Sequence, residues 1–191
     1  LFLMPNHFVI FDRVTATDPA YKKAWLIHTA HEPAVQGKTL RADHVKGRMF
    51  CRTLLPEDAV LTPVGGPGKE FLAGDDNWKL PDSKGLSPAQ LAMIGQWRVE
   101  VSPGAPRAED VFLHVIQVGD QAVEQMDTVE PIRAGGLVGA RLKVGAATWE
   151  VTFNTQGDLG GRVRRTGGPR PIDAALANRV TPQVGILARE R

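Results

Sequence analysis

The sequence predicts an almost all-β domain, an antiparallel two-sheet β-sandwich of about ten or more strands with one short helix in an insertion. Two observations lead to this fold class. Apolar and β-branched runs of strand length recur along the chain, and Gly, Pro, Asn or Asp bounds each of them. Helical patterns do not alternate with these runs, which argues against a parallel sheet with crossover helices. We therefore expect a single domain over residues 1–191.

The expected strands share a β-branched or aromatic composition, with alternation where one face is buried. They are residues 7–14, 22–29, 39–40, 48–55, 60–64, 96–101, 110–118, 136–144, 148–154 and 161–164. Residues 41–47 are predicted to form a hairpin connection. The sequence Gly-Gly-Pro-Gly at 65–68 predicts a loop, because glycine allows positive φ and proline lacks a donor.

Two short helical segments are predicted. In a polar insertion over residues 73–95, Ser87 suits the N-cap of a helix and Pro88 its first position. Residues 172–177, with the sequence Ile-Asp-Ala-Ala-Leu-Ala, are predicted to form one or two helical turns.

Charge and cysteine content exclude several classes of protein. The chain has 23 basic and 21 acidic residues, so it offers no general field that would attract nucleic acid or an anionic membrane. Arginines gather at 162–170 without interleaved aromatic residues for base stacking, and no apolar run is long enough to span a bilayer. The single cysteine, Cys51, excludes an internal disulfide and predicts a buried, inert thiol.

Histidines are the candidate metal ligands. His28 ends the run Trp25-Leu26-Ile27-His28, where alternation places it on the face of Leu26 and opposite Trp25. His31, three residues further on, would face the other side of a continuing strand, so the two cannot share one metal ion without a bulge. From these residues alone His28 is either a structural strand residue or one ligand of a zinc site whose partners the sequence does not identify.

Catalytic motifs are absent from the sequence. It has no Gly-x-Ser-x-Gly nucleophile elbow, and the segment 65–69 lacks the spacing of a phosphate-binding P-loop. We predict no catalytic residue. Trp78, in the polar insertion, is the tryptophan best placed to be exposed and to stack on a sugar ring, while the other three lie in expected strands and are assigned to the core. Tyr21, the only tyrosine, is assigned a packing role.

Four stretches, taken in order, resemble the C-terminal β-sandwich region of the heparinase II/III-like family of polysaccharide lyases. The first two are Phe8-Val9-Ile10-Phe11-Asp12-Arg13-Val14 and Lys22-Lys23-Ala24-Trp25-Leu26-Ile27-His28. The others are residues 47–56, Gly-Arg-Met-Phe-Cys-Arg-Thr-Leu-Leu-Pro, and residues 65–71, Gly-Gly-Pro-Gly-Lys-Glu-Phe. The resemblance covers roughly the first half of the chain.

This resemblance implies a function and a cofactor. Such lyases cleave uronic-acid-containing polysaccharides by β-elimination, and an N-terminal α-helical toroid carries the tyrosine that acts as acid. Several members hold a structural zinc ion through two histidines and an aspartate, and the histidine of the Trp-Leu-x-His strand, here His28, resembles the last ligand. The other ligands are expected upstream of Leu1, in a chain that begins inside an apolar stretch and is therefore interpreted as a C-terminal fragment.

The expected function is thus that of a supporting β-sandwich domain, inactive alone, which partners the helical domain of the same protein and an acidic polysaccharide. Export, either secreted or periplasmic, follows only from that class of substrate. Two alternatives stay open: a carbohydrate-binding module that uses Trp78, and a purely structural or assembly module. Neither a nucleic acid nor a membrane partner is expected.

Overall fold

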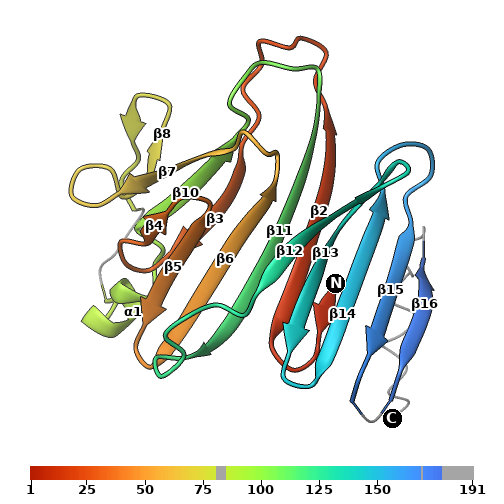
Figure 1. Ribbon diagram of the computed structural model, residues 1–191. Coiled ribbons are helices and arrows are strands. Elements are labelled where there is room, and N and C mark those ends of the chain that lie inside the picture. The colour runs from red at the N-terminus through yellow and green to blue at the C-terminus, as the bar shows by residue number, and fades with distance from the viewer. Residues whose placement is uncertain (81–84, 169, 178–191) are drawn as a thin grey trace, which may run out of the picture. The chain divides into compact units, whose positions relative to one another are not determined.

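The computed structural model describes residues 1–80, 85–168 and 170–177, and these residues form sixteen β-strands and one short helix (Figure 1). The paired strands run antiparallel. The predicted all-β, sandwich-like fold is therefore confirmed. The chain divides into two compact units, Leu1–Val129 and Glu130–Arg191, which are called the first and second units below.

The first unit contains two large sheets. The larger has six strands in the spatial order β1 (Phe2–Leu3), β2 (His7–Thr15), β11 (Glu109–Asp120), β6 (Gly47–Leu55), β5 (Thr39–His44) and β4 (Ala34–Gln36). The smaller has three strands in the order β3 (Trp25–Thr29), β10 (Trp97–Ser102) and β7 (Val60–Gly65). The longest strand, β11, pairs with both β2 and β6 and forms the centre of the larger sheet.

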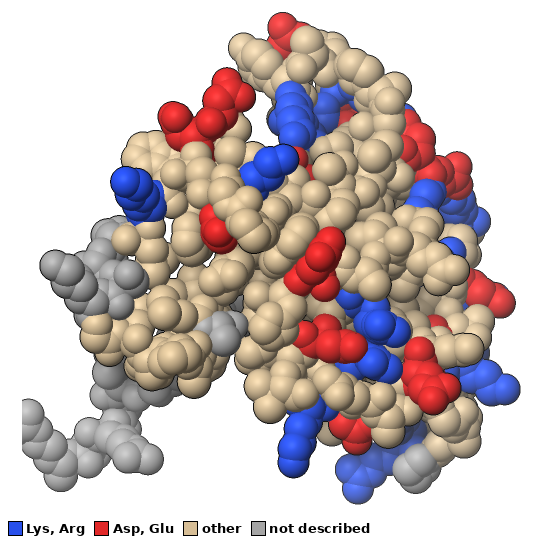
Figure 2. All heavy atoms as spheres, turned by 90° about the vertical axis from the view of Figure 1, so that its left-hand side faces the viewer, with Lys and Arg blue, Asp and Glu red and all other residues tan. Residues whose placement is uncertain are grey.

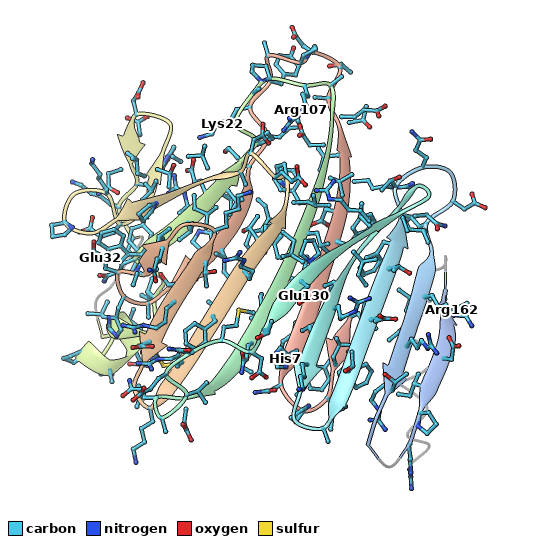
Figure 3. The ribbon with its side chains drawn as sticks, in the orientation of Figure 1. His7, Lys22, Glu32, Arg107, Glu130 and Arg162 are labelled. Atoms are coloured by element: carbon cyan, nitrogen blue, oxygen red, sulfur yellow. The ribbon has the colours of Figure 1, made fainter. Side chains whose placement is uncertain are left out.

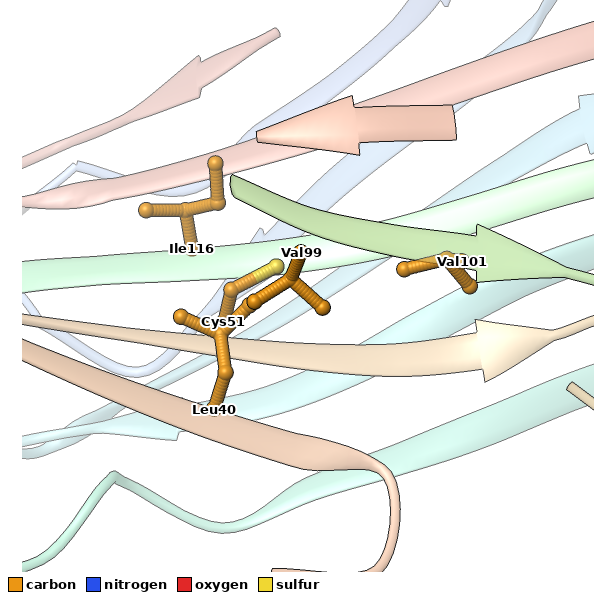
Figure 4. Packing of buried hydrophobic residues seen from close by; sticks show 5 residues of the cluster. All are labelled: Leu40, Cys51, Val99, Val101 and Ile116. Atoms are coloured by element: carbon orange, nitrogen blue, oxygen red, sulfur yellow. The ribbon is translucent and has the colours of Figure 1, made fainter. Parts of the chain in front are cut away.

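A hydrophobic core joins these two sheets face to face (Figure 4). The larger sheet contributes Leu40, Cys51 and Ile116, and β10 of the smaller sheet contributes Val99 and Val101. All five side chains are buried. Because side chains alternate across a strand, every second residue points into this core and the residues between them face away from it.

The insertion after β7 forms a small hairpin, β8 (Leu72–Ala73) with β9 (Asp76–Asn77), and the helix α1 (Pro88–Ala92). The predicted cap is confirmed: Ser87 Oγ accepts a hydrogen bond from the Gln90 backbone N–H, and Gln90 Oε1 accepts one from the Ser87 N–H. These reciprocal bonds satisfy donors at the helix start. Residues 81–84 of the insertion lie outside the described residues.

The predicted glycine loop after β7 is also confirmed. Gly66 has φ of +76°, and a Cβ atom built there would lie 2.7 Å from the ring of Trp97. Only glycine combines this backbone conformation with such a close approach of an indole. The loop therefore allows Trp97 to cover the end of β7.

The second unit is a five-stranded meander in which each described strand neighbours the next along the chain. Its strands are β12 (Val129–Ala134), β13 (Leu137–Val144), β14 (Ala147–Asn154), β15 (Gly161–Thr166) and β16 (Ile172–Leu176). The helical prediction for 172–177 is wrong, because this segment pairs with β15 instead. Its ladder bonds to β15, together with an ion pair of 2.5 Å between Arg162 and Asp173, override the modest helix propensity of its alanines.

One further prediction needs correction. Residues 41–44, assigned to a hairpin connection, belong to strand β5, and only Val45 and Lys46 form the turn to β6. Val45 adopts φ of +55°, a conformation that is costly for a β-branched side chain. The turn is thus tighter than its sequence predicts.

Candidate functional site

Strand β3 positions His28, the residue predicted as a metal ligand. Trp25 and Ile27 pack against the core, whereas Leu26 and His28 are exposed, as the alternation predicts. The imidazole of His28 therefore lies on the outer face of the smaller sheet. It could serve as a ligand for an ion held from that side.

The neighbours of His28 on this face are a charged group of residues. Its cross-strand partner in β10 is Arg98, whose guanidinium donates to Glu100 Oε1 through Nε at 2.9 Å and through Nη2 at 2.7 Å. Glu100 also accepts a hydrogen bond of 2.6 Å from Lys22, and this bond, followed by that from Arg98, lowers the pKa of Glu100 against the opposing effect of burial. The carboxylate of Glu100 is thus already bound by two cations.

Two other histidines come together at the edge of the first unit. His31 follows β3 of the smaller sheet, and His44 ends β5 of the larger sheet. His31 Nε2 lies 3.2 Å from His44 Nδ1, and the two rings are tilted by 35° with their centroids 5.2 Å apart. Sequence spacing gave no sign of this pair, because its members are thirteen residues apart, one in the loop after β3 and the other at the end of β5.

A cavity of about 390 Å³ lies beside His44. Its lining includes His28, His44 and the ion pair between Asp43 and Arg48. Arg48 donates to the two carboxylate oxygens of Asp43 at 2.7 and 2.9 Å, and these bonds hold the pKa of Asp43 below its usual value. The positive charge of Arg48, which lines this cavity, is therefore neutralised by Asp43.

Within residues 1–80, 85–168 and 170–177, no three His, Cys, Asp or Glu side chains are arranged to hold one metal ion. The structure brings His31 and His44 together but does not add His28 as a third ligand. A zinc ion bound by His28 would need ligands from outside the described residues.

Trp78, the predicted sugar-stacking residue, is 66% exposed, which confirms its expected place on the surface. It follows the hairpin β8–β9, and its backbone N–H donates to the carbonyl of Phe71. Asn77 braces the same hairpin by accepting from the Phe71 N–H and donating to Glu70. The indole is therefore held on an ordered turn.

Of the other three tryptophans, all assigned to the core, one is buried and two are half-buried. Trp149 is buried, Trp25 packs on the core of the first unit, and Trp97 covers the glycine loop. Tyr21 departs from its assignment. It is 61% exposed, because it lies in the turn from Asp18 to Tyr21, where its N–H donates to the Asp18 carbonyl.

Three side chains with titratable groups are buried. Cys51 is buried, as predicted, and burial raises the pKa of its thiol to about 12, so it is not a reactive thiolate. His114 is fully buried, stacks on Trp25 with ring centroids 3.8 Å apart, and shares a hydrogen bond with Thr53. His7 is also fully buried, with Nε2 3.5 Å from Asp127 (Figure 3).

Burial makes both of these histidines less basic. It lowers the pKa of His114 to about 3. Burial also lowers the pKa of His7, although Asp127 and Gln117 oppose that shift. Sequence analysis assigned no role to either residue, because a strand histidine carries no pattern that distinguishes a buried imidazole from an exposed one.

Surface charge on this protein is mixed. Figure 2 shows Lys and Arg side chains interspersed with Asp and Glu side chains over one face. Among the described residues, no helix is long and apolar enough to cross a membrane.

No model of a known protein family matches the sequence. No curated protein sequence matches it either.

Proposed function

We propose that this chain is the β-sandwich part of a polysaccharide lyase similar to the heparinase II/III-like enzymes, and that it supports the catalytic domain without performing the reaction alone. The observation that carries the proposal is the form of β3. In the segment that resembles the family motif, Trp25 is anchored on the core while His28 is presented outward. A strand with this alternation can lend a fixed imidazole to a site completed by another segment.

In this proposal the catalytic domain and the β-sandwich have different roles in β-elimination. Neutralising the uronate carboxylate, removing the C5 proton and protonating the leaving oxygen belong to the catalytic domain. The β-sandwich supplies a rigid surface for the polymer and one ligand of a structural zinc ion. His28 fits that role as an exposed imidazole, and the charge of its neighbour Arg98 is offset by Glu100.

The proposed full-length lyase should contain about one equivalent of tightly bound zinc, and His28→Ala should remove it. Metal analysis of both proteins after dialysis against a weak chelator measures this directly. Leu26→Ala is the matched control, because it alters the same exposed face of β3 without removing a ligand. Zinc that persists in His28→Ala would contradict the assigned ligand, and a parent protein without zinc would contradict the site.

A second candidate function, a carbohydrate-binding module, is favoured by the exposure of Trp78. An indole on a braced turn can stack on a pyranose ring through its apolar faces. This function requires no helical domain. The chain alone would then bind uronic-acid-containing polymers.

Under this second function Trp78→Ala should weaken polysaccharide binding about fivefold, the loss expected for one stacking platform worth about 1 kcal/mol. Affinity electrophoresis in gels containing an acidic polysaccharide measures the change. Met93→Ala, which alters another exposed apolar side chain near the insertion, is the control and should leave mobility unchanged. Equal retardation of all three proteins would exclude Trp78 as the sugar contact.

A further inference from the structure

We propose that His31 and His44 form a binding site for a single divalent transition-metal ion, represented by Zn²⁺, in which the metal joins the loop between β3 and β4 to the end of β5. The site is separate from His28 and does not depend on the proposed lyase function. Its ligating atoms are Nε2 of His31 and Nδ1 of His44, which lie 3.2 Å apart.

The distance between these two nitrogens suits shared coordination. Two imidazole nitrogens on a tetrahedral zinc ion, each about 2.05 Å from the metal, are separated by about 3.3 Å. The rings are tilted by 35° and are not stacked face to face, so the ring edges that carry the nitrogens approach each other. The contact is a hydrogen bond between the two rings, so a metal ion would replace its proton, and each ring would turn to direct a lone pair at the ion.

The backbone on both sides of the pair is fixed. Thr29 Oγ1 donates to the carbonyl of His31 at 2.8 Å, which holds the segment after β3. His44 pairs with Gly47 across the hairpin, and Gln121 donates to the carbonyl of Val45 in the turn between them. Val45 keeps its positive φ in this turn, and backbone strain of this kind often occurs next to functional residues. The two imidazoles are thus presented by ordered segments, which reduces the entropy lost when they bind a metal.

The charges around the pair permit a cation. Arg48, which lines the adjacent cavity, is bound to Asp43 and also donates to the carbonyls of Gln121 and Val123. These contacts hold the guanidinium in a fixed, neutralised position. Glu32, next to His31 in the sequence, is exposed and adds a negative charge (Figure 3).

Two protein ligands leave coordination positions open. His31 is exposed and His44 is partly exposed, and the cavity beside His44 has a volume of about 390 Å³, which is room for water molecules. Zinc sites with an open position bind water or a further ligand there. We therefore expect an exchangeable site with micromolar affinity, in contrast to a closed structural site that retains its ion during purification.

Isothermal titration of the purified chain with Zn²⁺ at neutral pH tests the proposal. One equivalent should bind, and His31→Ala and His44→Ala should each weaken binding about tenfold or more. Leu26→Ala is the matched control, because it alters an exposed side chain of β3 and removes no imidazole, and should change the affinity less than about twofold. His28→Ala is measured beside it to separate this site from the one proposed for His28. In ¹⁵N spectra of the histidine rings, Zn²⁺ should shift Nε2 of His31 and Nδ1 of His44.

Three outcomes would overturn the proposal: no saturable binding up to millimolar Zn²⁺, binding that survives the double substitution of His31 and His44, or loss of binding in His28→Ala alone. The last would instead favour the proposed role of His28, so the two hypotheses fail separately. Thermal unfolding without metal checks that each variant folds, and His44→Gln replaces His44→Ala if the latter does not.

Discussion

Asp110→Ala should lower the free energy of unfolding by about 3–5 kcal/mol, the cost expected when one member of a buried ion pair is removed. Asp110 begins the buried part of β11, and its side chain is 2% exposed. Its carboxylate lies 3.2 Å from the ammonium group of Lys23, whose side chain is 7% exposed. Without Asp110, a buried cation would lose its counter-charge.

This ion pair joins the two sheets of the first unit. Asp110 belongs to the larger sheet, and Lys23 precedes β3 of the smaller one. Arg107 extends the network by donating to Asp110 Oδ1 at 2.9 Å and to both carboxylate oxygens of Asp58 (Figure 3). Lys23 also donates to the backbone carbonyl of Arg107. Loss of Asp110 therefore affects three connected segments.

Urea denaturation of the wild-type chain and its variants measures the effect. Asp58→Ala removes an acid from the same network at a site that is 40% exposed, and should cost less than about 1 kcal/mol. The double variant Lys23→Met with Asp110→Leu should recover much of the loss, because it removes both charges and keeps apolar volume. If Asp110→Ala and Asp58→Ala cost the same, the Lys23–Asp110 pair does not carry the stability assigned to it.

Sequence patterns predicted most of the β-strands because local alternation reflects burial on one face. The run at β3 is an example, since its alternating apolar positions placed Trp25 inside and His28 outside. Strand β12 was missed because Pro131 and its polar neighbours lack that alternation. Proline is tolerated at the edge of a sheet, and β12 is an edge strand of its sheet.

The prediction for the segment that forms β16 was wrong for a different physical reason. The segment Ile-Asp-Ala-Ala-Leu has no strong preference of its own, and its alanines favour a helix slightly. Pairing with the exposed edge of β15 supplies hydrogen bonds that a two-turn helix cannot match. No local pattern contains information about the edge to which a segment will pair.

The candidate sites show the same division between local and long-range information. The exposure of Trp78 followed from its polar insertion, and alternation placed His28 on the strand face opposite Trp25. The approach of His31 to His44 depends on how the loop after β3 folds beside the end of β5, so it could not be read from either segment. Contacts between residues distant in sequence therefore define the part of the chemistry that sequence analysis missed.

The pH dependence of stability should be set by the buried histidines between about pH 6.5, the unfolded pKa of histidine, and about pH 3, the folded pKa of His114. The folded-state pKa of His114 is about 3, below its unfolded value of 6.5. Below pH 6.5 the unfolded chain therefore binds a proton that the folded chain does not, so stability is full above this pH and falls as the pH decreases. His7 acts in the same direction, because burial also lowers its pKa.

The lowered pKa of His114 alone should reduce the free energy of unfolding by about 1.4 kcal/mol at about pH 5.5. Each further pH unit should remove about the same amount until the folded pKa of His114 is reached. Urea denaturation at several pH values compares the slope of wild type with that of His114→Gln, which keeps a polar group beside Thr53 but cannot titrate. The slope should become shallower in His114→Gln. Because the comparison uses the slope and not the absolute stability, a constant packing cost of the substitution does not affect it. An unchanged slope in His114→Gln would mean that the imidazole takes up a proton in the folded protein, and that its stack on Trp25 accommodates a charge.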